Sequence, residues 1–390
     1  MITVHAARAH LFDLVAPLEE VEIALHEAHG RVLSRAVRAT RTQPPFAASS
    51  MDGYAVKAIE AQRHAMFRVI GEAAAGHRFD GTVGPGQAVR IFTGAPVPEG
   101  ADFIIIQEDT TLNGEILTLT DDPGTGSNIR PAGGDFSIGA TLSAPRELRA
   151  TDIALLAAMN VARVPVRRRP VVALISTGDE LVMPGETPGP DQIIASNTFG
   201  LKAMLESAGA EVRLLPIARD TETALRLAFD LAAGADLVIT IGGASVGDHD
   251  LVGTVAETLG MERAFYKVAM RPGKPLMAGR LRGAAMLGLP GNPVSAMVCG
   301  HVFVIPMVRR MLGLGNEAPR LRPAVLGAGI GANGPREHYM RAIVDDGRLI
   351  AFDNQDSSLL SLLSQANALL VRAPGDPARE IGDAVEYLPI

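Results

Sequence analysis

The sequence predicts a fold of the α/β plus β class: a central, mostly parallel α/β sheet domain with smaller domains around it. Three observations lead to this prediction. The chain has 390 residues, more than one hydrophobic core usually contains, so two or more domains are expected. Between residues 170 and 315, apolar runs alternate with helical patterns, as in a parallel sheet covered on both faces. Short apolar runs separated by Gly and Pro fill much of the remainder.

The composition is that of an ordinary soluble globular protein, at 47% hydrophobic and 20% charged residues. A formal net charge of -7 argues against nucleic acid as a partner, because phosphate binding favours a basic surface. The single cysteine, Cys299, excludes an intramolecular disulfide and a cysteine-built zinc site, and its apolar neighbours predict a buried thiol. We see no signal-peptide pattern and expect no run that crosses a membrane, so the expected location is cytoplasmic.

Residues 1–43 and 137–169 are assigned to an elongated N-terminal and linker domain. The first segment is predicted to be helical, with apolar residues on a helical period from Ala6 to Leu18 and a further helix end at Gly30. The second segment contains a predicted helix from Thr151 to Val161. Between them, Pro44-Pro45 holds the chain extended and marks a domain boundary.

Residues 44–136 are predicted to form an inserted small β domain, with strand candidates at 69–72, 88–91, 101–106 and 116–119. Its loops carry four polar residues of interest: Asp52, Thr93, Arg130 and Asp135. Asp52 lies in an Asp-Gly turn just before a strand, where an aspartate commonly bonds to its own backbone. From the sequence alone, that local role is the favoured interpretation of Asp52.

The central domain, residues 170–315, begins with a strand at 171–175 and continues with strands near 211–216, 237–241 and 265–270. Helices are predicted at 197–207, 220–233 and 250–259. Residues 316–390 alternate apolar and polar side chains and are predicted to form a C-terminal β-rich domain. The central domain is therefore the expected location of the chemistry, because open α/β sheets bind ligands at the carboxyl ends of their strands.

Three carboxylates, Glu180, Asp220 and Asp250, fall where successive predicted strands meet the following helices. A parallel sheet brings such positions to one edge, and carboxylates that crowd together usually hold a cation. Hard oxygen ligands without nearby cysteine favour Mg²⁺ over zinc. For each aspartate taken singly, a helix N-cap is the simpler interpretation.

Two glycine-containing turns, at 242–245 and 291–295, each follow an apolar strand and open a helix. Backbone N–H groups at a helix N-terminus suit a phosphate or another oxyanion. Lys267, Arg271 and Lys274 flank a Pro-Gly turn and add the cationic groups that an anion site needs. Neither turn has the glycine spacing of a dinucleotide fingerprint or a Walker A loop, so the residues predict a site for a nucleotide or phosphorylated ligand without naming the reaction.

The order of several motifs resembles one family, the molybdopterin molybdenumtransferases, which comprise the bacterial MoeA enzymes and the E domains of gephyrin and its plant homologues. The motifs are Met51-Asp52-Gly53-Tyr54-Ala55-Val56, Phe92-Thr93-Gly94-Ala95, Ser176-Thr177-Gly178-Asp179-Glu180-Leu181, Gly242-Gly243-Ala244-Ser245-Val246-Gly247, Pro272-Gly273-Lys274-Pro275, Leu289-Pro290-Gly291-Asn292-Pro293-Val294-Ser295-Ala296 and Gln355-Asp356-Ser357-Ser358. They cover nearly the whole chain.

The resemblance implies an elongated homodimer that inserts molybdate into adenylylated molybdopterin and releases AMP, with Mg²⁺. It implies Asp52, Asp135, Glu180, Asp220 and Asp250 as catalytic residues, the last three of them also as metal ligands. Candidate partners are a molybdopterin adenylyltransferase and apo-molybdoenzymes. Ligand-binding roles are implied for Thr93, Arg130, Thr177, Gly178, Asp179, Asn197, Gly242, Gly243, Ser245, Lys267, Arg271, Lys274, Pro290, Asn292 and Ser295, with Arg336 and Ser357 or Ser358 as further anion contacts. Asp52, Thr93, Arg130 and Asp135 are implied to approach from the other subunit.

Three departures from the family pattern stand out: Ala47-Ala48 replaces a common Asp-Asn, Arg271 replaces a common Lys, and Gly134 replaces a common Glu. Two alternatives stay open, a molybdopterin adenylyltransferase and a gephyrin-like scaffold. The extra β domains argue against the first, and the retained carboxylates argue against a pure scaffold. A sugar or nucleotide kinase is disfavoured because no phosphoryl-transfer motif is present.

Overall fold

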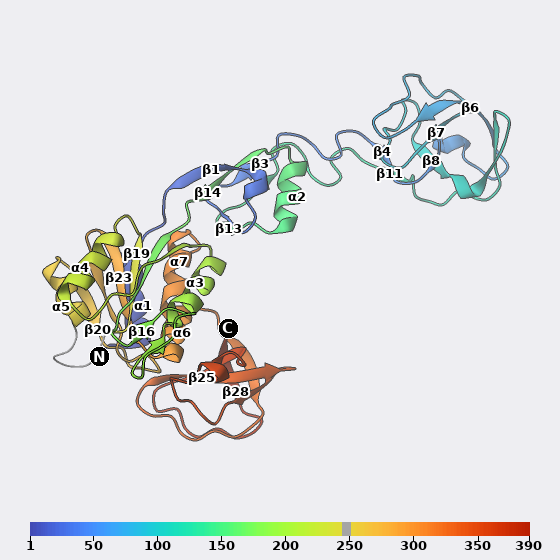
Figure 1. Cartoon of the computed structure of the whole chain (residues 1–390). Coiled ribbons are helices and arrows are strands. Elements are labelled where there is room, and N and C mark those ends of the chain that lie inside the picture. Colours follow the sequence, from blue (N-terminus) through green and yellow to red (C-terminus); the bar gives the residue numbers. More distant parts are fainter. Residues whose placement is uncertain (244–250) are drawn as a thin grey trace.

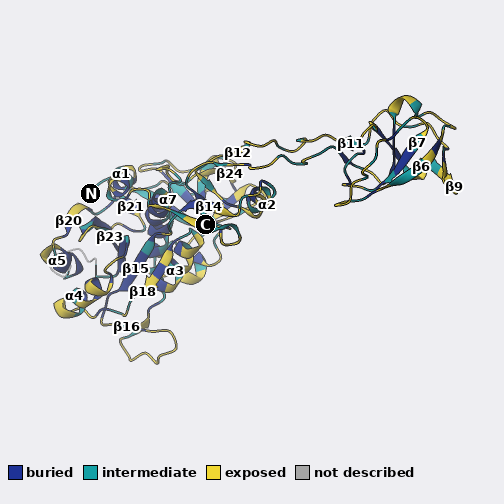
Figure 2. Ribbon diagram, turned by 90° about the horizontal axis from the view of Figure 1, so that it is seen from above, coloured by how far each residue is buried: buried dark blue, intermediate teal, exposed yellow. Residues whose placement is uncertain are grey.

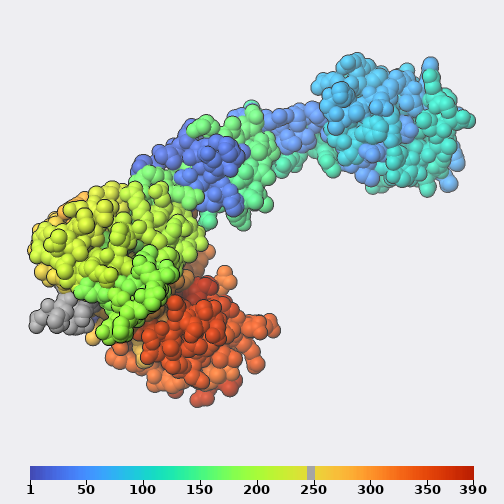
Figure 3. All heavy atoms as spheres, in the orientation of Figure 1, coloured from blue at the N-terminus to red at the C-terminus, as the bar shows by residue number. Residues whose placement is uncertain are grey.

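The computed structural model describes residues 1–243 and 251–390. The molecule is elongated, with a body at one end, a narrow arm, and a small β domain, here called the tip, at the other end (Figure 1). A C-terminal domain lies beside the body, and Figure 3 shows how thin the arm is between the body and the tip. The predicted α/β plus β fold class is confirmed. The predicted domain boundaries stay predictions.

The body is built on a six-stranded sheet of order β18-β15-β19-β23-β22-β20. Strands β18, β15, β19 and β23 run parallel, and β22 and β20 extend the sheet antiparallel. The sheet is thus mostly parallel, as predicted. Its strands are β15 (Val171–Ser176), β18 (Glu211–Leu214), β19 (Leu237–Ile241), β20 (Glu262–Tyr266), β22 (Met277–Leu281) and β23 (Ala284–Leu289).

Alternate residues of β15 face two different cores. Val172 and Leu174 pack with one set of helices, and Ala173 and Ile175 pack with another. Successive side chains of a strand point to opposite faces, so a strand buried on both faces appears as a continuous apolar run. The first set is α1 (Val4–Leu14), α3 (Asn197–Ser207), α6 (Pro293–Cys299), η4 (Gly300–Val304) and α7 (Ile305–Met311); the second is α4 (Glu222–Leu231) and α5 (Leu251–Thr258). Figure 2 shows these strands as the buried centre of the body.

The sheet register aligns the carboxyl ends of three parallel strands. Ser176 pairs with Ile241, and Ile241 pairs with Leu289. The residues that follow, Thr177, Gly242 and Pro290, therefore leave the sheet at one edge. This alignment determines the position of the ligand pocket.

The N-terminal segment differs from its prediction. Helix α1 forms, with the Thr3 hydroxyl accepting from the Ala6 amide, but Val4 and Leu11 are buried in the core of the body. The expected second helix is only a 3-10 turn, η1 (Leu25–Glu27), between strands. The remainder is mainly short strands: β1 (Glu20–Ala24), β2 (Val32–Leu33) and β3 (Val37–Arg38).

The arm pairs these strands with others from more than a hundred residues later. Strand β14 pairs with β1 and β2, β13 with β2, and β12 with β3. The predicted helix in this region is confirmed as α2 (Ala150–Ala158), beginning after Arg149. The later strands are β12 (Thr141–Leu142), β13 (Arg146–Glu147) and β14 (Arg163–Arg167).

Two stretches of chain connect the arm to the body, and Arg168 joins them. Its guanidinium bonds to Asp236 of the body through two nitrogens, at 2.8 and 2.9 Å, and it also pairs with Glu19 on the other stretch. Asp236 accepts a further bond, 2.7 Å long, from the Val171 amide at the start of β15. The ion pairs thus fix both chain crossings to the first strand of the body.

The tip contains a six-stranded sheet of order β8-β5-β7-β6-β10-β9. All four predicted strands are present, and Gly53 begins another directly after Asp52. A two-stranded ladder, β4 with β11, lies where the arm enters the tip. The elements are β4 (Ala48–Ser49), β5 (Gly53–Val56), η2 (Ala58–Glu60), β6 (Met66–Ala73), β7 (Gln87–Ile91), β8 (Phe103–Ile106), η3 (Gln107–Asp109), β9 (Thr110–Asn113), β10 (Ile116–Leu119) and β11 (Ile129–Arg130).

The C-terminal domain is a closed sheet, because β25 pairs with both β26 and β27 in the order β25-β26-β24-β28-β27. Strand β21 of the body also pairs with β25, which ties this domain to the body. The elements are β21 (Met270–Arg271), β24 (Arg322–Leu326), β25 (Glu337–Asp345), β26 (Arg348–Ala351), α8 (Leu360–Leu363), β27 (Ala368–Arg372) and β28 (Ala384–Pro389).

One continuous helical stretch, Pro293–Met311, is long and apolar enough to cross a membrane, contrary to our expectation. In the structure, however, 72% of the most apolar 18-residue segment of this stretch is buried, as in the core helix of a soluble protein. Cys299 lies within it and is buried as predicted, and that burial raises the pKa of its thiol to about 12.

Candidate functional site

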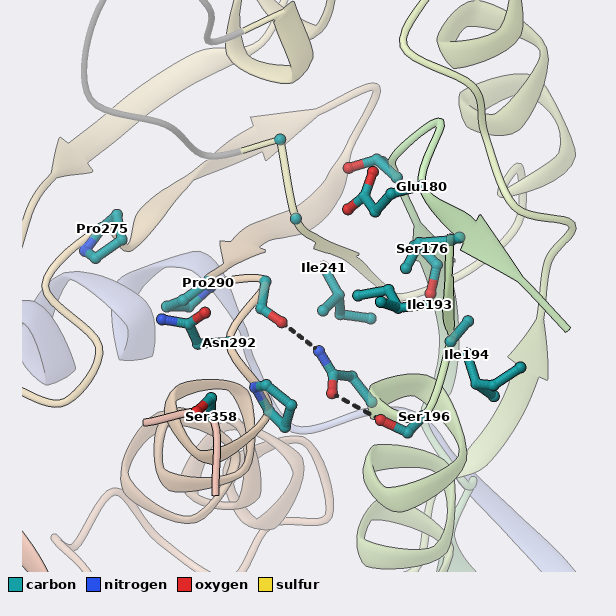
Figure 4. Close-up of a pocket in the computed structure, with 18 residues that line it drawn as sticks. Ser176, Glu180, Ile193, Ile194, Ser196, Ile241, Pro275, Pro290, Asn292 and Ser358 are labelled. Atoms are coloured by element: carbon teal, nitrogen blue, oxygen red, sulfur yellow. Dashed lines mark hydrogen bonds between the residues drawn. The ribbon is translucent and has the colours of Figure 1, made fainter. Parts of the chain in front are cut away.

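A pocket of about 580 Å³ opens at the carboxyl edge of the body sheet (Figure 4). Residues directly after β15, β19 and β23 form its floor, and the C-terminal domain contributes one side chain. The pocket is lined by Ser176, Thr177, Glu180, Leu181, Ile193, Ile194, Ala195, Ser196, Asn197, Ile241, Gly242, Gly243, Pro275, Pro290, Gly291, Asn292, Pro293 and Ser358. Eight of these were predicted from the sequence: Thr177, Glu180, Asn197, Gly242, Gly243, Pro290, Asn292 and, as one of two alternatives with Ser357, Ser358.

The turn after β19 can be made only with glycine. Gly242 has a φ of 97°, and a Cβ there would lie 2.6 Å from the Thr177 carbonyl oxygen. A Cβ on Gly243 would lie 2.9 Å from the Thr177 Oγ1. That hydroxyl is buried and has no hydrogen-bond partner among the described residues. The turn therefore leaves its backbone close to an unpaired polar group, which is a suitable arrangement for an oxyanion.

Glu180 reaches the pocket from a tight turn after β15. Gly178 is buried with a φ of 145°, and a Cβ there would lie 2.3 Å from the Glu180 Oε2. The Glu180 carboxylate therefore folds back over Gly178. The Glu180 carbonyl accepts a 2.8 Å bond from the Ile193 amide, which connects the turn to the apolar wall of the pocket. That wall begins with the short pair β16 (Leu181–Val182) and β17 (Ile193–Ile194).

Asp220 and Asp179 lie beside Glu180 without lining the pocket. The Asp220 amide donates to Asp179 Oδ1 at 3.2 Å. Partial burial, and then the nearby charges of Asp179 and Glu180, raise the pKa of Asp220 above its ordinary value. The expected meeting of Glu180 and Asp220 is thus present, and carboxylates that repel in this way favour a bound cation.

The third expected metal ligand, Asp250, lies outside the described residues, as does Ser245. Within the described ranges, no group of three or more His, Cys, Asp or Glu side chains is arranged to hold a metal. The crowded pair of Glu180 and Asp220 fits a hard cation such as Mg²⁺. The complete ligand set stays a prediction.

Two asparagines connect the pocket to neighbouring elements. Asn197, the first residue of α3, donates to the Gly291 carbonyl at 2.7 Å. Asn292, which precedes α6, donates to the Ser357 Oγ at 2.9 Å, and the Ser357 carbonyl accepts from the Val294 amide. These contacts hold a loop of the C-terminal domain against the body and bring Ser358 to the pocket.

That loop is supported by Arg341, whose side chain is buried in the C-terminal domain. Its guanidinium donates to the carbonyl oxygens of Asn354 and Leu359, both at 3.1 Å, and makes a longer contact with Gln355. A buried guanidinium that donates to backbone carbonyls fixes the course of the chain around it. The position of Ser358 therefore depends on a residue that never reaches the pocket.

The predicted cations lie around the pocket instead of lining it. Lys267 is half-buried with a φ of 67°, and its ammonium group lies over the Tyr266 ring. Arg271 and Lys274 are exposed, with Lys274 directly before the pocket residue Pro275. The predicted Ser295 is buried in the first turn of α6.

The four predicted residues of the β domain are far from this pocket. Asp52 and Thr93 lie together in the tip, where Asp52 Oδ1 accepts from the Thr93 amide at 2.7 Å and from its hydroxyl at 2.8 Å. These two bonds, the backbone one first, lower the pKa of Asp52. Arg130 in β11 and Asp135 after it are exposed where the arm meets the tip. Figure 1 places the tip at the far end of the arm from the body, whose sheet edge forms the pocket.

Sequence reasoning missed several pocket residues: Ser176, Leu181, Ile193, Ile194, Ala195, Ser196, Ile241, Pro275, Gly291 and Pro293. Five of them, Ser176, Leu181, Pro275, Gly291 and Pro293, lie inside the motifs quoted above but were not predicted as site residues. Ile193 and Ile194 lie in a polar and glycine-rich stretch that carries no local signal for a ligand wall. It is the contact of the Ile193 amide with Glu180 that brings them to the site.

An α/β body with a pocket at the carboxyl ends of its strands, joined to β domains on both sides, is the architecture of a multidomain α/β protein that binds a ligand at a sheet edge. Models of three family regions match successive parts of the chain. They are the MoeA N-terminal region (domain I and II) at residues 2–160, the probable molybdopterin binding domain at 173–310, and the MoeA C-terminal region (domain IV) at 323–390.

Molybdopterin molybdenumtransferase 2 of Mycobacterium tuberculosis is 36% identical over 372 residues, covering 92% of each chain. The molybdopterin molybdenumtransferase of Nostoc sp. is 38% identical over 318 residues, covering 78% of this chain and 73% of the relative. The crystal structure of a MoeA protein from Pyrococcus horikoshii superposes with a TM-score of 0.84 at 25% identity over 100% of both chains. The chain therefore belongs to the molybdopterin molybdenumtransferase (MoeA) family, whose members are enzymes of molybdenum cofactor biosynthesis.

Proposed function

We propose that the chain inserts molybdate into adenylylated molybdopterin and releases AMP. The two dithiolene sulfurs replace one oxygen of molybdate, which leaves as water with the two thiol protons, and one water cleaves the phosphoanhydride bond. The observation that carries this proposal is the pocket at the carboxyl edge of the body, which is lined by a glycine turn, by Glu180 with Asp220 close beside it, and by an apolar wall. A ligand with flat rings and a diphosphate needs all three. Family membership supplies the particular substrate.

In this proposal the backbone of Gly242 and Gly243 and the Thr177 hydroxyl hold phosphate oxygens. Ile193 and Ile194 lie against an apolar face of the ligand, and Asn197, Asn292 and Ser358 orient it. Glu180 and Asp220, with Asp250, would hold Mg²⁺, which would neutralise charge on the diphosphate. Lys267, Arg271 and Lys274 attract the molybdate anion to the pocket edge.

The same proposal includes a homodimer in which the tip of one copy completes the pocket of the other. Within one chain, Glu180 follows β15 of the body, whereas Asp52, Thr93, Arg130 and Asp135 adjoin or lie in β5, β7 and β11 of the tip and its junction with the arm, and Figure 1 draws the tip at the far end of the arm from the body. If all of them serve one reaction, a second copy must supply the tip residues. Further parts of the proposal are a cytoplasmic location, a docked molybdopterin adenylyltransferase as the source of substrate, and apo-molybdoenzymes as acceptors.

The activity is tested by incubating the purified chain with adenylylated molybdopterin, molybdate and Mg²⁺. AMP release and reconstitution of an apo-molybdoenzyme are both followed. We expect molybdate-dependent AMP release with reconstitution, reduced at least about 100-fold in Glu180→Gln. AMP formed only from ATP would instead indicate an adenylyltransferase, and binding without turnover would indicate a scaffold.

The shared site is tested by mixing two impaired variants, Glu180→Gln and Asp52→Ala. A mixed dimer contains one intact composite site and one doubly altered site. Random exchange of subunits should therefore restore about a quarter of wild-type activity, because half of the dimers are mixed and half of their sites are intact. Each variant mixed with itself is the control. No recovery, with mixed dimers verified by mass, would show that each pocket acts without a second tip.

A further inference from the structure

Arg219 contacts the turn that carries Glu180. It lies in the loop between β18 and α4, directly before Asp220, and its side chain is exposed. One guanidinium nitrogen, NH1, lies 2.9 Å from the Asp179 carbonyl oxygen, 3.1 Å from that of Leu181 and 3.4 Å from that of Gly178. Three carbonyls of a single turn thus converge on one donor.

The loop of Arg219 holds the same turn by backbone bonds as well. The Gly178 amide donates to the Ala218 carbonyl at 3.1 Å, and Thr177 and Ala218 form an isolated β-bridge. These bonds secure the beginning of the turn. At its far side, the Leu181 carbonyl is reached by Arg219, so the side chain spans the length of the turn.

Electrostatic repulsion would favour opening of this turn if no residue held it closed. The turn carries Asp179 and Glu180, and Asp220 approaches it from the neighbouring loop, so three carboxylates lie close together. Like charges at short range repel, and carbonyl oxygens pointing toward one another add to that repulsion. A guanidinium at the carbonyl side offsets both effects, because it is cationic and donates hydrogen bonds.

We propose that Arg219 is a positioning residue for the reaction: by donating to the carbonyls of Gly178, Asp179 and Leu181, it keeps the Glu180 carboxylate directed into the pocket. The effect on turnover rests on the proposed function. The effect on the turn does not, because it follows from the contacts alone. Arg219 itself does not line the pocket.

The experiment compares Arg219→Gln, Arg219→Lys and a matched control, Arg213→Gln. Arg213 is an exposed arginine of β18 that also donates to a backbone carbonyl, that of Ala233 at 3.4 Å, but it lies outside the pocket and its turn. Circular dichroism verifies that all variants are folded. Hydrogen exchange is measured on peptides covering residues 177–183 and 192–195, and steady-state kinetics give kcat and KM.

In Arg219→Gln, we expect exchange in these peptides to become about tenfold faster, since local opening of the turn loses one of its restraints. We also expect kcat to fall about tenfold or more with KM within about twofold, because a displaced carboxylate affects the reacting geometry more than binding. Arg219→Lys should recover part of the loss, because an ammonium keeps the charge and three donors. Arg213→Gln should match the wild type in both measurements.

A double-mutant comparison separates positioning from a general structural role. If Arg219 acts through Glu180, adding Arg219→Gln to Glu180→Gln should lower kcat no further. An equal loss in both backgrounds, or unchanged exchange in Arg219→Gln, would overturn the proposal. If the wild-type chain releases no AMP at all, the proposed function fails, and the exchange comparison with Arg213→Gln still decides whether Arg219 holds the turn.

Discussion

Asp220 beside the pocket and Asp52 in the tip are the same residue type in opposite electrostatic settings. Partial burial and the charges of Asp179 and Glu180 raise the pKa of Asp220. The amide and then the hydroxyl of Thr93 lower the pKa of Asp52. For Asp220, burial and like charges outweigh a backbone hydrogen bond from Asp179, whereas one oxygen of Asp52 accepts two hydrogen bonds from Thr93.

This difference separates two ways in which an acidic residue can serve a site. A carboxylate that its neighbours repel gains most from a nearby cation, so Asp220 is suited to binding a metal. A carboxylate that already accepts two bonds is suited to fixing a loop, so Asp52 orders the Thr93 turn that the tip presents. The interpretation favoured from the sequence, an aspartate that bonds its own backbone, is wrong about the partner, because Asp52 accepts from Thr93 in a distant loop.

The largest expected effect comes from moving the carboxylate at the pocket without changing it. In Gly178→Ala, the new Cβ would lie only 2.3 Å from the present position of the Glu180 Oε2, so the carboxylate must turn away. We expect kcat to fall about 100-fold, as for a displacement of about 1 Å at a reacting group. The measurement is molybdate-dependent AMP release. Gly185→Ala is the control, since Gly185 also has a positive φ but no atom within 4 Å of its added Cβ.

A second effect should be confined to one end of the molecule. Asp220→Ala removes a carboxylate that would bind the cation and should weaken Mg²⁺ binding about 10- to 100-fold in a calorimetric titration. Asp52→Ala should leave Mg²⁺ affinity unchanged in the same titration without substrate. Equal weakening in both variants would mean that the tip residue is also a metal ligand, and the contrast between the two aspartates would be lost.

A smaller effect concerns stability in the absence of metal. A raised native pKa means that the contribution of Asp220 to stability is largest at acidic pH and is lost as the pH rises through that pKa. At neutral pH Asp220→Asn should therefore stabilise the body, by no more than about 0.5 kcal/mol because the group is exposed and screened. Urea unfolding in EDTA at several pH values measures it. A gain of equal size well below pH 3.8, the ordinary value for aspartate, would contradict the electrostatic cause.

The smallest expected effect concerns the tip, where the substitution should lower stability instead of raising it. Thr93→Val removes the hydroxyl donor but keeps the amide, so the pKa of Asp52 should rise part of the way to its ordinary value. Stability from Asp52 is present above the unfolded pKa and is lost as the pH falls from that value through the native one, so in the variant this stability should be smaller and its loss should be complete at a higher pH. Carboxyl NMR titration gives the pKa directly. An unchanged value would show that the amide bond alone sets it.

The body was predictable because its signals are local. Strand β15 is buried on both faces, so residues 171–175 form an unbroken apolar run. The start of α4 was also predicted, but its N-cap is Thr221 and not Asp220, the simpler interpretation from the sequence. The parallel alternation then brings Glu180 and Asp220 to one edge without any information beyond the pattern. The glycines at 242 and 243 were recognisable because the backbone there takes positive φ.

The remaining features depend on partners distant in sequence. Strand β1 pairs with β14, about 140 residues later, and nothing within residues 20–24 identifies that partner. Arg219 is an ordinary loop arginine until the Gly178 turn folds against it, and Ser358 reaches the pocket only through Asn292 and the buried Arg341. Family resemblance named Asp52 and Thr93, but only the structure shows their separation from Glu180.

The ion pairs of Arg168 lie where the long arm is attached to the body. A small rotation where the arm leaves the body becomes a large displacement at the tip, in proportion to the length of the arm (Figure 1). The two bonds to Asp236 and the pair with Glu19 therefore limit the range of positions that the tip can reach. In a dimer with shared sites, the position of each tip relative to the pocket of the other copy would therefore depend on one guanidinium, which lies far from the tip and from the pocket.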